Sequence, residues 1–193
     1  MKKVLSLLIA LSMILSMMSF VSVYSADNTV FFESFENGYS DWTLKTADYE
    51  SKLSVATDEA TDGKSSLKFT DDVEDTTFSI TSKKFPIKAG CDYLLSADCY
   101  APEGIAAKIY MQFLNVNGKS VFSQSIISSP RKWETLSKTY SAPEGAVDAV
   151  ILLWAQDKSV GVTYYDNIKV TEKGETFVDT YEVKALKDGE VAF

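Results

Sequence analysis

The sequence predicts an all-β domain, built as an antiparallel two-sheet β-sandwich. After residue 25 no segment has convincing helical periodicity, and short runs rich in β-branched and aromatic residues recur between Gly, Pro, Asn and Asp. Along the longer runs, aliphatic residues alternate with aromatic and polar ones, which gives each strand two different faces. Strands of this kind bury their aliphatic faces together as two packed sheets.

Ten segments carry this pattern, and glycine, proline or asparagine turns separate most of them. The turn Asn115–Lys119 contains Asn-Gly and lies between two long segments, so we expect a β-hairpin there. The predicted strands are 29–35, 52–56, 65–70, 76–82, 92–100, 106–115, 120–127, 131–141, 146–156 and 161–170.

The two cysteines lie at the ends of one predicted strand. Cys91 and Cys99 are eight residues apart, and eight residues of extended chain span about 26 Å. The Cα atoms of a disulfide lie within about 7 Å of each other. We therefore expect no bridge between them, with Cys99 in the core and Cys91 a free thiol near a turn.

The first 25 residues have the three parts of a secretory signal peptide. Lys2 and Lys3 give a positive start, an apolar stretch follows to about Val21, and small residues surround Ser25. We expect cleavage after Ser25 and a secreted, extracellular protein. The alternative is a membrane anchor, since about 18 apolar residues can cross a bilayer. No cluster of Lys or Arg follows the apolar stretch, which favours cleavage.

Charge and composition exclude several kinds of function. The chain has 27 acidic against 19 basic residues and no histidine. The acidity argues against nucleic acid and, after signal cleavage, against anionic membranes as partners. The absence of histidine excludes Ser-His-Asp and Cys-His catalysis and imidazole-based zinc sites. A domain of this length buries a sizeable core by itself, and we expect a monomer.

Aromatic and amide side chains share the predicted outward faces of two long strands. Sugars present apolar C–H faces ringed by hydroxyls, and proteins bind them with aromatic rings bordered by amides or carboxylates. A one-residue slip in register would turn these side chains inward, and they would then only cover a sheet. The predicted ligand-binding residues are Trp154, Gln156, Tyr110 and Gln112, with Asp98, Tyr100 and Gln124 extending the same surface.

Four segments, in order along the chain, resemble the carbohydrate-binding modules of families 4, 9 and 22. They are the Phe-Glu-x-Gly…Trp-like opening, the Gly-x-x-Ser-Leu-like strand, the Trp-x-x-Leu-Ser-like strand entry and the closing Tyr-x-Asp segment, at 35–42, 62–69, 132–137 and 164–170. The resemblance implies a galactose-binding-like jelly roll over residues 26–170. Residues 171–193 would then be a tail that adds an edge strand or begins a truncated second unit.

The resemblance also implies a structural calcium ion where the chain ends of the domain meet. Calcium prefers six to eight oxygen ligands. On the matching positions these would be the side chains of Asp166 and of Glu36 or Glu33, with carbonyls of Ser34, Lys64 and Ser65. The ligands implied are xylan or β-glucan chains. Trp42 and Trp133 would be packing residues, and Asp98 stands where many relatives carry an aromatic residue.

Three functions fit the sequence. The first is a secreted, non-catalytic carbohydrate-binding module, free-standing or accessory to a glycoside hydrolase. The second is a structural or adhesive cell-envelope sandwich that binds no glycan. The third is a small glycosidase or lyase that uses a carboxylate pair such as Asp98 and Glu134. The first is the prediction, because no carboxylate pair has recognisable spacing and one small sandwich leaves little room for a catalytic apparatus.

Overall fold

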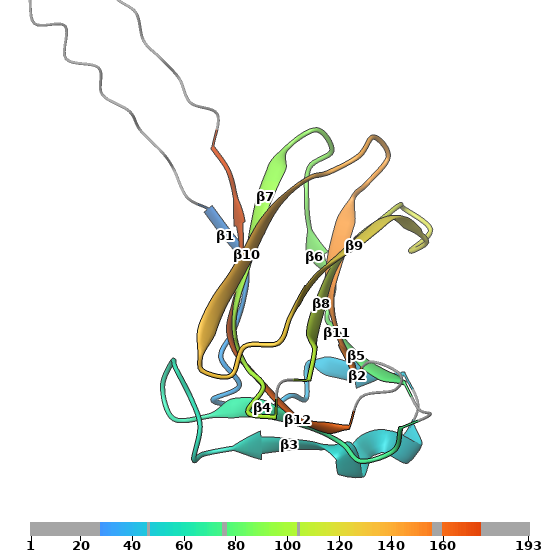
Figure 1. The fold of residues 1–193 in the computed structure, drawn as a ribbon. Coiled ribbons are helices and arrows are strands. Elements are labelled where there is room, and N and C mark those ends of the chain that lie inside the picture. The colour runs from blue at the N-terminus through green and yellow to red at the C-terminus, as the bar shows by residue number, and fades with distance from the viewer. Residues whose placement is uncertain (1–27, 46, 75–76, 104, 156–159, 175–193) are drawn as a thin grey trace, which may run out of the picture. The chain divides into compact units, whose positions relative to one another are not determined.

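The computed structural model describes residues 28–45, 47–74, 77–103, 105–155 and 160–174. The predicted signal peptide and most of the predicted tail lie outside these residues, and so does Gln156. Among the described residues, no helix is both long enough and apolar enough to cross a membrane. More than half of the described residues lie in strands and very few in helix, as the sequence predicts, and the strands form two antiparallel sheets (Figure 1).

Sheet A contains the first and last strands of the domain. Its strand order is β10-β7-β12-β4-β3, and β1 pairs with the second half of β12. The long β12 therefore joins most of the sheet, since it contacts β7, β4 and β1. The strands are β1 (Asn28–Glu33), β3 (Leu53–Ala56), β4 (Ser66–Asp71), β7 (Asp92–Tyr100), β10 (Glu134–Ser141) and β12 (Gly161–Glu172).

Sheet B has the order β2-β5-β11-β8-β9, and β6 pairs with the first residues of β11. One short 3-10 helix, η1 (Ala47–Lys52), follows the edge strand β2. Strands β11 and β8 lie at the centre of the sheet. The strands are β2 (Trp42–Leu44), β5 (Phe78–Ser82), β6 (Phe85–Pro86), β8 (Ala107–Leu114), β9 (Ser120–Ser128) and β11 (Asp148–Ala155).

The core lies between the two sheets, and alternation along the strands fills it. From β7 the residues Tyr93, Leu95, Ala97 and Cys99 are buried, as their parity predicts. From β8 and β11 the buried residues are Ile109, Met111, Phe113, Ile151, Leu153 and Ala155. This arrangement confirms the predicted two-sheet sandwich, which is consistent with a jelly roll.

The predicted local features hold, and two short strands were missed. The Asn115–Lys119 turn joins β8 to β9, and the Asn115 side-chain oxygen accepts the N–H groups of Asn117 and Lys119 at 3.0 Å. Cys91 and Cys99 are both free thiols. Strands β2 and β6 have only three and two residues, too few for alternation to show.

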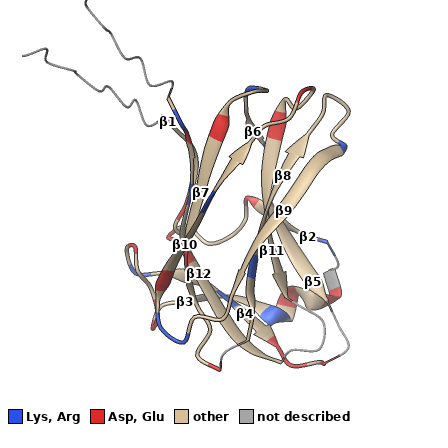
Figure 2. Cartoon of the chain, turned by 45° about the horizontal axis from the view of Figure 1, so that its top comes forward, with Lys and Arg blue, Asp and Glu red and all other residues tan. Residues whose placement is uncertain are grey.

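Charged side chains are unevenly spread over the fold. Figure 2 shows Asp and Glu mainly at strand ends and in loops, and leaves much of both sheets without charge. The described residues contain three ion pairs, Lys52–Asp72, Lys83–Asp41 and Lys88–Glu172. Some charged residues nevertheless lie within strands, such as Lys68, Lys108 and Lys138.

Candidate functional site

The outward face of sheet B carries the aromatic residues predicted to bind a ligand. Strand pairing places Leu152 opposite Tyr110, and Trp154 opposite Lys108. Since inward residues alternate with these along both strands, all four side chains point away from the core. We call this surface the Trp154 face; its central residues are Val150, Leu152, Trp154, Lys108, Tyr110, Gln112 and Leu114.

Two aromatic rings form the centre of the Trp154 face. The ring centroids of Tyr110 and Trp154 are 5.7 Å apart, and their planes meet at 50°. Both rings are partly exposed and pack against a small buried aliphatic cluster, Leu114, Val150 and Leu152. Packing on this floor restricts the rotamers of both rings, so the rings form a preformed apolar platform.

Polar groups border the platform. The Gln112 side-chain amide donates a hydrogen bond to the Ser123 hydroxyl at 3.1 Å, and its carbonyl oxygen stays available as an acceptor. On the other side of Trp154, a hollow of about 110 Å³ is lined by Lys45, Thr77, Phe78, Ser79 and Trp154. The face thus combines apolar rings with donors and acceptors within reach, which is the chemistry that a sugar requires.

The Lys108 ammonium lies above both rings. It is 5.4 Å from the centroid of Tyr110 and 5.8 Å from that of Trp154. These distances are within the range of cation–π attraction. The contact fixes the lysine between the two aromatic residues, where it can also donate to a ligand.

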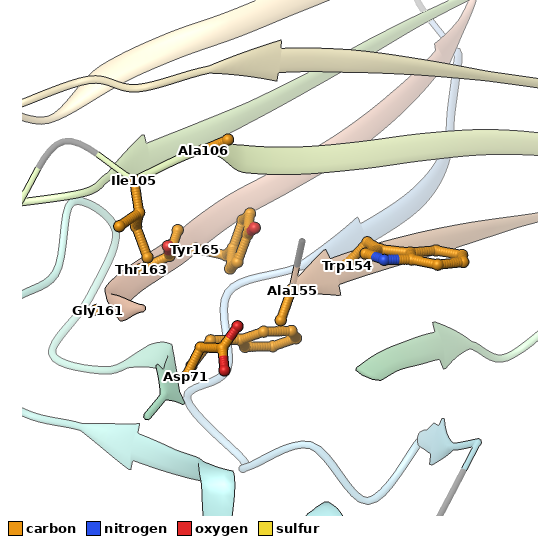
Figure 3. Close-up of a pocket in the computed structure, with 9 residues that line it drawn as sticks. Asp71, Ile105, Ala106, Trp154, Ala155, Gly161, Thr163 and Tyr165 are labelled. Carbon is orange, nitrogen blue, oxygen red and sulfur yellow. The ribbon is translucent and has the colours of Figure 1, made fainter. Parts of the chain in front are cut away.

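A small cavity lies behind Trp154, between the sheets. It measures about 10 Å³ and is lined by residues of both sheets, among them Asp71, Tyr165 and Ala155. Figure 3 shows the Asp71 carboxylate pointing into this cavity, whereas the Trp154 ring points away from it. Asp71 is 5% exposed, and its Oδ2 has no hydrogen-bond partner among the described residues. Burial raises the pKa of this carboxyl above its ordinary value.

Of the predicted ligand residues, the structure brings Trp154, Tyr110 and Gln112 together. Gln156 lies outside the described residues. Gln124 pairs with the inward residue Met111 and therefore lies on the other face of edge strand β9, where its side chain is exposed. The prediction that Gln124 extends the same surface is wrong, because β9 has the opposite parity at that residue.

Asp98 and Tyr100 do not lie on the Trp154 face either, because strand β7 belongs to sheet A. Asp98 is buried and accepts hydrogen bonds from Thr61, Thr135 and the Asn167 side chain, at 2.7, 2.5 and 3.2 Å. Tyr100 stacks on Tyr164, with centroids 5.7 Å apart. Both residues therefore hold sheet A together, and the predicted shared surface is wrong.

The carboxylate pair considered for catalysis is not assembled. Glu134 pairs with Cys99, whose side chain points into the core, and the neighbouring Asp98 pairs with Thr135. Asp98 and Glu134 therefore project from opposite faces of sheet A. A substrate bound on one face would reach only one of the two.

The predicted calcium ligands accept hydrogen bonds from N–H groups. Asp166 is fully buried; its Oδ2 accepts the backbone N–H of Thr61 and of Asp62, and its Oδ1 that of Asn167, at 2.7 to 2.9 Å. Glu36 Oε1 accepts the N–H groups of Lys64 and Ser65, at 2.7 and 2.6 Å. The Lys64 N–H is the main cause that lowers the pKa of Glu36.

Glu33 points elsewhere. Its two oxygens accept the N–H of Phe35 and the indole N–H of Trp42, at 2.9 and 3.1 Å. Within the described residues, no three acidic or cysteine side chains gather as a metal site. Calcium prefers a cage of free oxygens, and these side chains do not fit one as they stand, because N–H donors point at them. Calcium at Asp166, with carbonyls of Ser34, Lys64 and Ser65, stays a prediction of the sequence.

Lys108 and Lys45 were not identified as site residues from the sequence. Lys108 has the same parity as Tyr110 along its strand, which could have placed it on the platform. Lys45 follows the short strand β2, and its backbone N–H donates to the Ser79 carbonyl at 3.2 Å. The local sequence does not predict that Lys45 lies near Trp154, because β5 lies between their strands β2 and β11 in the sheet.

Solved structures share this sandwich. A family 16 carbohydrate-binding module is 21% identical, with a TM-score of 0.57 over 74% of this chain and 99% of that one. The CBM22-1 xylan-binding domain from Paenibacillus barcinonensis Xyn10C is 17% identical, with a TM-score of 0.55 over 77% of this chain and 97% of that one. At these identities the similarity establishes the fold alone.

Comparison with sequence families is more specific. No curated protein matches the chain. The model of the CBM_4_9 family, described as a carbohydrate binding domain, matches residues 27–161, which is more than half of the sequence. That range contains both aromatic residues of the platform. The chain therefore belongs to this family of carbohydrate-binding domains.

Proposed function

We propose that this protein is a secreted, non-catalytic module that binds polysaccharide chains of the xylan or β-glucan type on the Trp154 face. The observation that carries the proposal is the pair of Tyr110 and Trp154, with ring centroids 5.7 Å apart on a buried aliphatic floor. The membership of a carbohydrate-binding family supports it. The xylan-binding domain of similar fold supports the ligand class.

The platform suits the apolar side of a sugar ring. Stacking a pyranose on Trp154 and Tyr110 removes C–H and ring surface from water, at about 25 cal/mol per Å² of apolar area. The hydroxyls at the rim of the sugar then need partners, which Gln112 and Ser79 can supply.

The described residues give the catalytic alternative no support, since Asp98 and Glu134 lie on opposite faces of sheet A. We propose that the module acts by holding a glycan, as an accessory to hydrolases or on its own. A structural or adhesive sandwich without glycan binding remains the second candidate, and the test below separates it from the first.

Affinity electrophoresis of the protein in gels containing xylan, β-glucan, mannan or pectin tests the proposal. We expect retardation by xylan or β-glucan. Trp154→Ala should weaken binding at least about tenfold, which is typical of a central aromatic anchor, and Trp154→Phe should retain part of it. Phe32→Ala is the matched control, since Phe32 is 50% exposed on a strand of sheet A. Retardation by no glycan, or retardation indifferent to Trp154, contradicts the proposal.

A further inference from the structure

Two lysines lie on either side of Trp154 in one row across sheet B. Lys45 reaches Ser79 through its backbone N–H, Ser79 pairs with Trp154, and Trp154 pairs with Lys108. The Lys108 ammonium is 5.8 Å from the Trp154 ring centroid, and Lys45 lines the hollow of about 110 Å³ on the other side of that ring. Trp154 is therefore bordered by a lysine on each side.

These charges stand out because the chain is acidic, with a formal net charge of −8. In the part of the chain that the structure describes, all three ion pairs use other lysines, and none involves Lys45 or Lys108. Among the described residues of β8 and β11 on this face, the carboxylate is that of Asp148, at the opposite end of β11, six residues or about 20 Å from Trp154. Neither lysine therefore has an acidic partner among the described residues.

An anionic substituent would complete this arrangement. A carboxylate on a sugar ring stacked over Trp154 can accept hydrogen bonds from ammonium groups, and such charge-assisted bonds are about twice as strong as neutral ones. Ser79 and Thr77 line the same hollow and can donate to its remaining lone pairs. A neutral glycan would leave both ammonium groups hydrated. Its binding free energy would then come from the rings and not from the lysines.

We propose that the Trp154 face prefers polysaccharides that carry uronic acid groups, and that the carboxylate binds between Lys45 and Lys108. This inference rests on the proposed function, because it assigns a ligand class to the same face. It differs from binding of anionic polymers in general, since the acidity of the whole chain opposes non-specific attraction. Recognition then needs both the ring platform and the two local charges.

The test uses two polymers that differ only in charge: a xylan with glucuronic acid side groups, and the same xylan after chemical reduction of its carboxyl groups to alcohols. Calorimetric titration of the full protein should give about tenfold weaker binding of the reduced polymer. Raising the salt concentration should weaken binding of the acidic polymer and have little effect on the reduced one, since salt screens exposed charges beyond about 8 Å at physiological strength.

The double variant Lys45→Gln/Lys108→Gln removes both charges and keeps most of each aliphatic stem. We expect it to bind both polymers with the affinity that the wild type shows for the reduced one. Lys68→Gln is the matched control, because the Lys68 ammonium lies 5.6 Å from the Tyr164 ring on sheet A and makes the same kind of contact away from the face. The control should keep the wild-type preference.

Equal affinity of the wild type for the two polymers overturns the inference. So does a double variant that still prefers the acidic polymer, or a Lys68→Gln variant that loses the preference. If the reduced polymer still binds through Trp154 in these cases, the proposed function stands and only the charge preference fails. If neither polymer binds the wild type, the charge preference fails, and the β-glucan gel decides separately whether the proposed function stands.

Discussion

Asp166, the buried carboxylate of β12, accepts the backbone N–H of Thr61 at 2.7 Å across 105 positions of sequence. The same side-chain oxygen also accepts the N–H of Asp62 at 2.9 Å, and it lies 3.1 Å from the Thr61 hydroxyl oxygen, which donates its proton to Asp98. One carboxylate therefore holds the loop between β3 and β4 onto the last strand of the domain. The loop needs this contact because its N–H groups have no sheet partner there.

Replacing Asp166 with Ala should strongly destabilise the fold. The change removes the acceptor of three part-buried backbone N–H groups, and a donor left without a partner costs about 1–3 kcal/mol when it is fully buried. We expect a loss of about 2 kcal/mol in the free energy of unfolding, measured by urea denaturation. Asp98→Ala should cost less, because its partners are side-chain groups of Thr61, Thr135 and Asn167 that can turn to water. An Asp166→Ala loss no larger than that of Asp98→Ala contradicts this assignment.

The calcium prediction can be tested by melting with and without a chelator. An ion that binds only the folded state raises the melting temperature by mass action. Because N–H groups already occupy both oxygens of Asp166 and Oε1 of Glu36, we expect the melting temperature to be the same in excess EDTA and in millimolar calcium. A fall of several degrees in EDTA, reversed by calcium and absent in Asp166→Asn, would instead support the ion.

A side chain at Gly63 should displace the Glu36 carboxylate. Its φ of +70° favours glycine, and a Cβ there would lie 2.5 Å from the Glu36 carboxyl carbon. Gly63→Ala would displace the carboxylate that accepts the N–H groups of Lys64 and Ser65. We expect a larger loss of unfolding free energy than the backbone strain alone would cause.

Gly90→Ala is the control for this change. Its φ is +81°, and nothing lies within 4 Å of a Cβ built there. It should show the backbone strain alone, about 1 kcal/mol. If the two alanine variants lose the same stability, displacement of Glu36 contributes nothing.

Asp71 should make the protein less stable as the pH rises. Burial raises the pKa of Asp71 in the folded state, so the folded protein holds this proton more tightly than the unfolded chain does. The free energy of unfolding begins to fall as the pH rises above the ordinary aspartate pKa of about 3.9. The fall is complete above the pKa that Asp71 has in the folded protein. Asp71→Asn cannot ionise. Its melting temperature should therefore exceed that of the wild type at pH 7, and the difference should shrink towards pH 3.

The neighbouring Asp72 gives a control of opposite sign. It is exposed and paired with Lys52, whose hydrogen bond lowers the pKa of Asp72. Asp72→Asn should therefore slightly lower the melting temperature at pH 7, as loss of a surface ion pair does. Circular dichroism melts of both variants between pH 3 and 8 measure the two trends. An Asp71→Asn variant less stable than the wild type at pH 7 contradicts the assigned penalty.

Alternation along each strand was enough to predict the sandwich and the inward faces. Tyr93, Ile109 and Ile151 point into the core as expected, because a strand with one aliphatic face has only one way to bury it. The platform residues Tyr110 and Trp154 follow from the same parity. These parts of the fold depend on local sequence alone.

The alternation of side chains along a strand does not predict which sheet that strand joins. Asp98 and Tyr100 point outward, as the sequence suggests, but from sheet A, so they lie on the other side of the sandwich from Trp154. Strand order depends on contacts between residues far apart in the chain, such as those of β12 with β7 and β4. The approach of Lys45 to Trp154 depends on the same long-range order, which no local pattern reveals.

The row of Lys45, Ser79, Trp154 and Lys108 runs across the strands, and neighbouring strands of a sheet are about 4.8 Å apart. A chain molecule laid along this row meets a different strand at each step, and each strand contributes one side chain to the contact. For a glycan bound as proposed, a substitution on one strand would change recognition at one position of the polymer and leave the next positions as they were. The pattern of substituents along the polysaccharide would then be selected position by position, without any change to the buried half of the same strands.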